Sequence, residues 1–155
     1  MHRFLRAFWP TFLWMGVIFL MSTDLGATQH TGRILTPLLR WFYPEITDQA
    51  LAWAHYAVRK GGHVFEYAVM AWLLVHALNT LCGRWWSWRQ VGYAFGFTVL
   101  FAITDETHQL FVASRGASVT DVGIDAVGAA AGLALAYIWR VWIRRSPVRF
   151  EPAPA

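Results

Sequence analysis

The sequence contains little charge and very little cysteine, and each scarcity excludes a class of protein. Charged residues make up 14% of the 155 residues, against about 25% in soluble domains. The single cysteine, Cys82, rules out an intramolecular disulfide and provides no basis for a thiolate metal site. The sequence also has no HExxH zinc motif, no internal repeat and no low-complexity run. These absences argue against a soluble globular domain, a disulfide scaffold and a zinc protease.

Hydrophobic residues, in contrast, are abundant. They make up 57% of the chain, which includes 10 Trp, and clustered Trp residues suit the interfacial belt of a membrane protein. The net charge of +4 does not indicate nucleic-acid binding, because many of the arginines flank apolar segments as juxtamembrane anchors do. The composition predicts one membrane domain over residues 1–150, followed by a flexible C-terminal tail at 151–155.

Four segments are apolar and long enough to cross a bilayer, which takes about 20 residues. The third segment turns polar after Ile103. No small-x-small cleavage site follows the first segment, so we expect an uncleaved span. The predicted fold is an all-α, polytopic membrane helical bundle of about four transmembrane helices, at about residues 4–21, 62–81, 91–111 and 119–143.

The segment between the first two spans is too long for a simple turn. Thr31–Trp41 and Thr47–Val58 are both amphipathic, which predicts one or two short helices in the outer interface. Thr47 is a suitable N-cap for the second, with Asp48 in its first turn. The bias of Lys and Arg between loops predicts a multi-pass protein of the cell membrane with both termini in the cytoplasm.

Seven acidic or histidine side chains lie inside or at one end of the apolar segments. Ionisable groups at membrane depth are costly and usually face protein or a water-filled cavity. With the predicted topology, all seven fall toward the outer side: His63, Glu66, Asp105, Glu106, His108, Asp121 and Asp125. This clustering is the strongest functional signal in the sequence.

Helical spacing groups these residues into faces. Residues three and four apart share a face, which places His63 with Glu66, and Asp105 with His108. On the fourth span, Gly128 and Gly132 extend the stripe of Asp121 and Asp125, and glycines allow close helix approach. We therefore predict that this stripe crosses the second or third span, and that leucine at Ala129, beside the stripe, is tolerated better than leucine at Gly128.

Each residue taken alone also has a structural interpretation. His63 would hydrogen-bond a backbone carbonyl, Glu66 would pair with Lys60 or Arg59, and Arg115 would neutralise Asp121. Taken together, the cluster favours a functional site, because several carboxylates packed together repel one another and resist desolvation. The i,i+3 pairs of His and carboxylate are also found in di-metal bundles, which use more Glu and His than this chain offers, so metal and cofactor remain open.

The run from Arg59 to Tyr67, which reads RKGGHVFEY, resembles a signature of VanZ-like integral membrane proteins. Asp105–Phe111, followed by Arg115, Asp121 and Gly128, resembles the second signature, and Ser22 also fits the pattern. The resemblance covers about residues 18–133 and departs from the family near Asp125, where the family usually has Asn. It implies a link to glycopeptide (teicoplanin) resistance.

The polar cluster and the resemblance together give a candidate site. The candidate catalytic residues are acid–base groups and orienting or metal-binding carboxylates: His63, Glu66, Asp105, Glu106 and Asp121. The candidate ligand-binding residues include two cations suited to a headgroup phosphate: Lys60, Tyr67, Gln109, Arg115 and Asp125.

Three hypotheses follow for the function. The first is an enzyme that acts on an envelope lipid or cell-wall precursor at the outer leaflet. The second is a non-catalytic protein that binds a lipid or glycopeptide, and the third is a small transporter or flippase subunit. The expected partners are membrane lipids and a lipid-linked or glycopeptide ligand, with no nucleic acid. The sequence leaves open whether the chain is an enzyme, and its oligomeric state.

Overall fold

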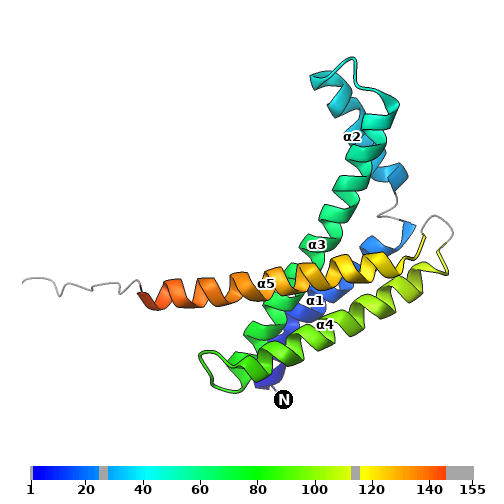
Figure 1. Cartoon of the computed structure of the whole chain (residues 1–155). Coiled ribbons are helices and arrows are strands. Elements are labelled where there is room, and N and C mark those ends of the chain that lie inside the picture. Colours follow the sequence, from blue (N-terminus) through cyan, green and yellow to red (C-terminus); the bar gives the residue numbers. More distant parts are fainter. Residues whose placement is uncertain (1, 25–27, 113–115, 146–155) are drawn as a thin grey trace, which may run out of the picture.

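The computed structural model describes residues 2–24, 28–112 and 116–145, and within these ranges every regular element is a helix. The all-α prediction is therefore confirmed, while the predicted tail at 151–155 lies outside the described residues. Figure 1 shows the five helices in chain order: α1 (His2–Ser22), α2 (Thr28–Phe42), α3 (Asp48–Leu81), α4 (Trp88–Gln109) and α5 (Val119–Arg145).

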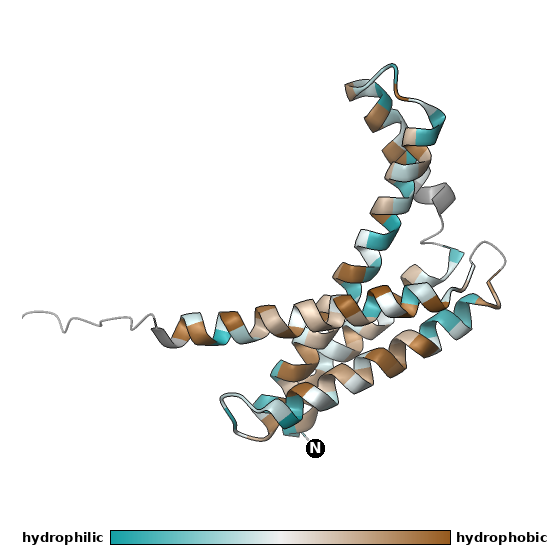
Figure 2. Cartoon of the chain, in the orientation of Figure 1, coloured by the Kyte–Doolittle hydropathy of each residue, from teal (hydrophilic) through white to brown (hydrophobic). Residues whose placement is uncertain are grey.

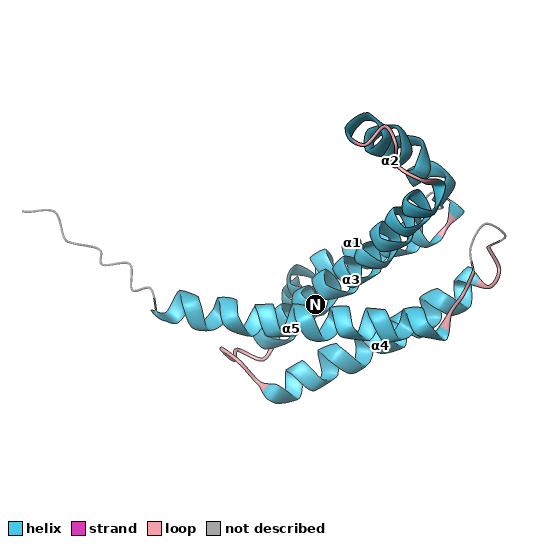
Figure 3. Ribbon diagram, turned by 45° about the horizontal axis from the view of Figure 1, so that its top comes forward, coloured by secondary structure: helices cyan, strands magenta, loops and turns pink. Residues whose placement is uncertain are grey.

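Helix α3 is the centre of the arrangement. It packs most extensively against α5 and also contacts α1, α4 and α2. The N-terminal half of α3 extends beyond the other long helices, and α2 packs along this extension (Figure 1). The turned view in Figure 3 shows α4 lying alongside α5, with which it makes contact. Every other helix is thus held in place, directly or through a neighbour, by α3.

Helix α3 is longer than the sequence suggested. Thr47 caps it as predicted, since its side chain accepts a hydrogen bond from the Ala50 N–H at 3.2 Å. However, the predicted helix at 47–58 is not separate, because it continues without a break into the predicted second span. No proline interrupts Asp48–Leu81, and 34 residues give a length of about 50 Å. Only α2 is a separate short helix in this region.

Three helices are long and apolar enough to cross a membrane among the described residues: His2–Ser22, Asp48–Leu81 and Val119–Ile143. Helix α4 is not one of them, because its last turns carry Thr104, Asp105 and Glu106. Large hydrophobic side chains such as Trp9, Leu13 and Ile138 are exposed on the outside of the helices. Figure 2 shows apolar residues along much of the length of the bundle helices. The exposed apolar side chains are those expected of a surface that contacts lipid.

Two glycines bring α5 very close to α3. A Cβ atom on Gly128 would lie 2.5 Å from the Val64 carbonyl oxygen, and one on Gly132 would collide with the backbone of Ala68. The predicted crossing is therefore confirmed, and its partner is the helix of the second predicted span. Ala129 is itself fully buried in the apolar core with Leu133, whereas any side chain at Gly128 would meet the backbone of Val64. That leucine is tolerated better at Ala129 than at Gly128 stays a prediction.

Substituting these glycines tests the crossing. Gly132→Ala should destabilise the fold by about 1–3 kcal/mol, because the added methyl group forces the backbones apart. Gly123→Ala on the same helix is the matched control, since a Cβ there meets nothing within 4 Å, and it should be neutral or slightly stabilising. Equilibrium unfolding in mixed micelles, followed by circular dichroism, measures both. Equal stability of the two variants would contradict the crossing.

Candidate functional site

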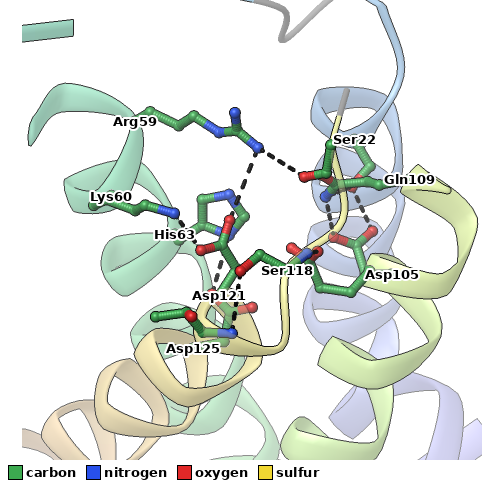
Figure 4. A network of polar contacts seen from close by, with 12 residues as sticks. Ser22, Arg59, Lys60, His63, Asp105, Gln109, Ser118, Asp121 and Asp125 are labelled. Carbon is green, nitrogen blue, oxygen red and sulfur yellow. Dashed lines mark hydrogen bonds and ion pairs between the residues drawn. The ribbon is translucent and has the colours of Figure 1, made fainter. Parts of the chain in front are cut away.

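Polar side chains from four helices meet at the level where α3 extends out of the bundle. They come from the C-terminal ends of α1 and α4, the N-terminal end of α5, and the middle of α3. Figure 4 shows these side chains pointing toward one another, joined by hydrogen bonds and ion pairs. The labelled members are Ser22, Arg59, Lys60, His63, Asp105, Gln109, Ser118, Asp121 and Asp125. We call this group the polar centre, together with Glu106.

The outer part of the polar centre is an ion-pair network around Asp121. The Asp121 carboxylate belongs to a buried residue. It accepts a hydrogen bond from the Lys60 ammonium and lies 3.8 Å from the Arg59 guanidinium. Arg59 also donates to the Gly116 carbonyl at 3.4 Å. The sequence interpretation, which paired Lys60 or Arg59 with Glu66, did not include this contact, in which both cations reach across to α5. Such a pairing offsets much of the desolvation of a buried carboxylate.

One turn deeper, His63 meets Asp125. The His63 Nδ1 atom lies 3.1 Å from Asp125 Oδ1, and both side chains are buried. The second oxygen, Asp125 Oδ2, is also buried and has no hydrogen-bond partner among the described atoms. The sequence interpretation of His63 bonded to a backbone carbonyl is replaced by this side-chain contact between α3 and α5.

Glu106 of α4 joins the same group from the other side. Its Oε2 atom accepts a hydrogen bond from the Ser118 backbone N–H at 2.8 Å, which fixes the end of α4 against the start of α5. Its Oε1 atom is buried and, within the described ranges, unpartnered. His63, Glu106 and Asp125 each place one potential ligand atom within 4.8 Å of the other two. Three helices thus contribute one donor each to a single point.

A second buried cluster joins α1 to α4. Ser22 Oγ donates to Asp105 Oδ1 at 2.5 Å, and Gln109 Nε2 donates to both Ser22 Oγ at 3.0 Å and Asp105 Oδ2 at 3.1 Å. All three side chains are buried. Both Asp105 oxygens are therefore hydrogen-bonded, in contrast to the open oxygens of Glu106 and Asp125.

The remaining predicted residues have different surroundings. Tyr67 is fully buried, and Glu66 is partly buried one turn from His63. His108, which helical spacing placed on one face with Asp105, also faces α1 and packs its ring on Phe19 at 4.8 Å between centroids. Arg115 lies outside the described residues.

The VanZ/LLP1 family model matches residues 8–140, a range that contains every residue of the polar centre. The chain belongs to the VanZ/LLP1 family. Comparisons with curated proteins and with solved structures gave no significant match. Family membership and three apolar helices of spanning length identify a membrane protein.

Sequence reasoning underestimated three residues of this VanZ-family site. Ser22 was noted only as part of the family pattern, yet it connects α1 to Asp105. Arg59 and Ser118 also take part, through a side chain and a backbone N–H respectively. Helical periodicity relates residues within one helix only, so it gave no sign of contacts that depend on how α1, α3, α4 and α5 cross.

The charges in the VanZ-family polar centre do not balance. Of its described residues, four carboxylates are buried: Asp105, Glu106, Asp121 and Asp125. The two described cations of the centre, Arg59 and Lys60, both contact Asp121. Asp105 has hydrogen bonds from neutral groups, whereas Glu106 and Asp125 each keep one open oxygen. This excess of negative charge is concentrated beside His63.

Removing the Ser22 hydroxyl tests the link between α1 and α4. Ser22→Ala should destabilise the protein by about 1–3 kcal/mol, because buried Asp105 and Gln109 each lose a partner. Ser87→Ala is the control, since Ser87 precedes α4 without a side-chain capping bond, and it should change stability by less than about 0.5 kcal/mol. Micelle unfolding measured side by side gives the difference. A loss no greater in Ser22→Ala than in the control would refute the link.

Proposed function

We propose that this VanZ-family protein binds the polar headgroup of an envelope lipid or lipid-linked cell-wall precursor at its polar centre. The observation that carries the proposal is the convergence of buried ionisable side chains from separate apolar helices. Such groups are expensive in a membrane protein and are rarely kept without a role. A purely structural bundle would be held together as well by apolar side chains.

The two cations at the rim support a headgroup with a phosphate. The Arg59 and Lys60 side chains are 29% and 17% exposed, whereas their partner Asp121 is 2% exposed. A ligand that approaches from the water side therefore meets the cations before the carboxylates. Arg and Lys are the usual protein partners of phosphate oxygens. A bound phosphate would compete with Asp121 for both side chains.

The contact of His63 with Asp125 favours an enzyme as the second candidate. A carboxylate that holds one ring nitrogen of a histidine orients the imidazole and leaves the other nitrogen to exchange a proton with a substrate. The 3.1 Å separation and the burial of both residues meet this requirement. In the enzyme hypothesis the bound headgroup is also the substrate. Glu66, Asp105 and Glu106 then contribute to the electrostatic field around it.

The proposed topology has four crossings, with α4 as the fourth and both termini in the cytoplasm. The polar end of α4 lies in the polar centre, where its carboxylates are shielded from lipid by α3 and α5. Its outer surface is still apolar, with exposed Phe97, Leu100 and Ile103. A helix of 22 residues is long enough to cross a bilayer of about 30 Å. The polar centre then faces the outside of the cell.

Cys82 provides a direct test of this topology, because it is the chain's single cysteine and is exposed between α3 and α4. A membrane-impermeant maleimide should label it in inverted vesicles and leave it unlabelled in intact cells. Gly116→Cys in a Cys82→Ser background should show the opposite pattern, since Gly116 is exposed between α4 and α5. Labelling of both positions from the same side would mean that α4 does not cross.

Lipid analysis tests the headgroup proposal. In a strain whose deletion mutant has an altered envelope-lipid profile or altered teicoplanin susceptibility, His63→Ala and Lys60→Met should each reproduce the deletion phenotype. His76→Ala is the control, because this histidine lies on the same helix but contacts Arg140, away from the polar centre. Membrane levels of each variant are compared by immunoblotting. Full complementation by both site variants would rule out the proposed role.

A further inference from the structure

We propose that His63, Glu106 and Asp125 bind one divalent metal ion. The three side chains come from α3, α4 and α5, and each brings one nitrogen or oxygen donor within 4.8 Å of the other two. They are 6%, 5% and 1% exposed, respectively. Each of the three helices contributes one ligand from the part predicted to face outward. This set differs from the i,i+3 pairs of His and carboxylate that the sequence suggested.

The open carboxylate oxygens are the first reason for a metal. Glu106 Oε1 and Asp125 Oδ2 are buried without a hydrogen-bond partner in the described part of the chain, although their sister oxygens are held by Ser118 and His63. A buried, unpaired carboxylate oxygen is strongly unfavourable. A cation between the two side chains would satisfy both oxygens at once.

The excess negative charge is the second reason. Asp121 already takes both described cations of the polar centre, so among the described residues only His63 remains to offset the charge of Glu106 and Asp125. A divalent ion supplies two positive charges at the point where the carboxylates face each other. Carboxylate repulsion, otherwise unfavourable in a low-dielectric interior, then becomes part of the binding energy.

The spacing of donors agrees with this assignment. The 3.1 Å separation of His63 Nδ1 from Asp125 Oδ1 is also close to that of two donors on one metal ion, since bonds of about 2.0–2.2 Å place neighbouring ligands about 3 Å apart. All three donor atoms lie within 4.8 Å of one another, so side-chain adjustment would bring them onto a single ion.

The chemistry of the donors indicates the class of ion. One imidazole and two carboxylates suit Zn²⁺, Mn²⁺ or Fe²⁺ better than Mg²⁺ or Ca²⁺, which prefer oxygen donors alone. Three protein ligands leave at least one position on the ion for water or for an oxygen of a ligand. If the proposed function holds, that position would receive the headgroup phosphate; the metal site itself does not depend on this.

Metal analysis of the purified full-length protein tests the proposal. The protein is purified in detergent without chelator, and its metal content is measured by mass spectrometry. It is then treated with EDTA and titrated with Mn²⁺ and Zn²⁺ separately, by calorimetry and by thermal unfolding. We expect about one ion per chain and a rise in the unfolding temperature with one of the two ions.

Four variants assign the ligands. His63→Ala, Glu106→Gln and Asp125→Asn should each weaken binding more than about tenfold and abolish the thermal shift. Asp105→Asn is the matched control, because it removes an equally buried carboxylate whose oxygens are both hydrogen-bonded, and it should keep the ion. Asp125→Asn and Glu106→Gln are near-isosteric and relieve charge repulsion, so at least one should fold normally without metal.

The proposal is overturned if the wild-type protein binds neither ion specifically, or if the three ligand variants bind as well as wild type. Equal loss in Asp105→Asn would also overturn it, because binding would then reflect the overall negative charge. These readouts are independent of lipid analysis. Metal binding without any lipid phenotype would count against the proposed function alone, and a lipid phenotype without metal binding would count against the metal site alone.

Discussion

Buried carboxylates from α4 and α5 lie against α3, and the way in which their charge is offset governs the rest of the structure. Asp121 is neutralised by Lys60 and Arg59 of α3. Asp105 is stabilised by neutral donors from Ser22 and Gln109. In the described part of the chain, Glu106 has a hydrogen bond from the Ser118 N–H and Asp125 has one contact with His63. Neighbouring buried carboxylates are thus stabilised in three different ways: by cations, by neutral donors, and by a histidine and a backbone N–H.

The close crossing of α3 and α5 makes these contacts possible. Gly128 and Gly132 lie against the backbone of Val64 and Ala68, one and two turns deeper than Asp125. The acidic stripe of α5 is therefore held directly against the turn of α3 that carries Lys60 and His63. Helix propensity alone would favour alanine at the two glycines, so their presence reflects the need for close packing. Close packing in the apolar half of the bundle thereby positions the side chains of the polar centre.

Much of this arrangement follows from the sequence. Apolar length and helical period located α1, α4 and α5 to within a few residues, and the cost of charge in an apolar segment identified His63 and the four buried carboxylates of the polar centre. The errors have specific causes. His108 shares the α1-facing side of α4 with Asp105, as its spacing predicted, yet it packs on Phe19 while Asp105 bonds to Ser22, because spacing within α4 does not determine which residue of α1 each side chain meets.

The partners of the charged groups were harder to predict. Lys60 is less than two turns from Glu66 along the same helix, but it pairs with Asp121, 61 positions away in the chain. Pairings of this kind depend on the crossing of α3 and α5, which periodicity within a helix does not fix. The length of α3 was also missed, because its polar first half and apolar second half read as separate elements, although no proline divides them.

The central claim is that residues from separate helices meet in one polar centre, and cysteine cross-linking in native membranes tests it most directly. In a Cys82→Ser background, Ser22→Cys combined with Asp105→Cys should form a disulfide under mild oxidation, because the two native side chains are in hydrogen-bond contact. Ser22→Cys combined with Thr104→Cys should not, because the Thr104 side chain is exposed and bonds within its own helix. Efficient cross-linking of the control pair, or none of the Asp105 pair, would contradict the polar centre.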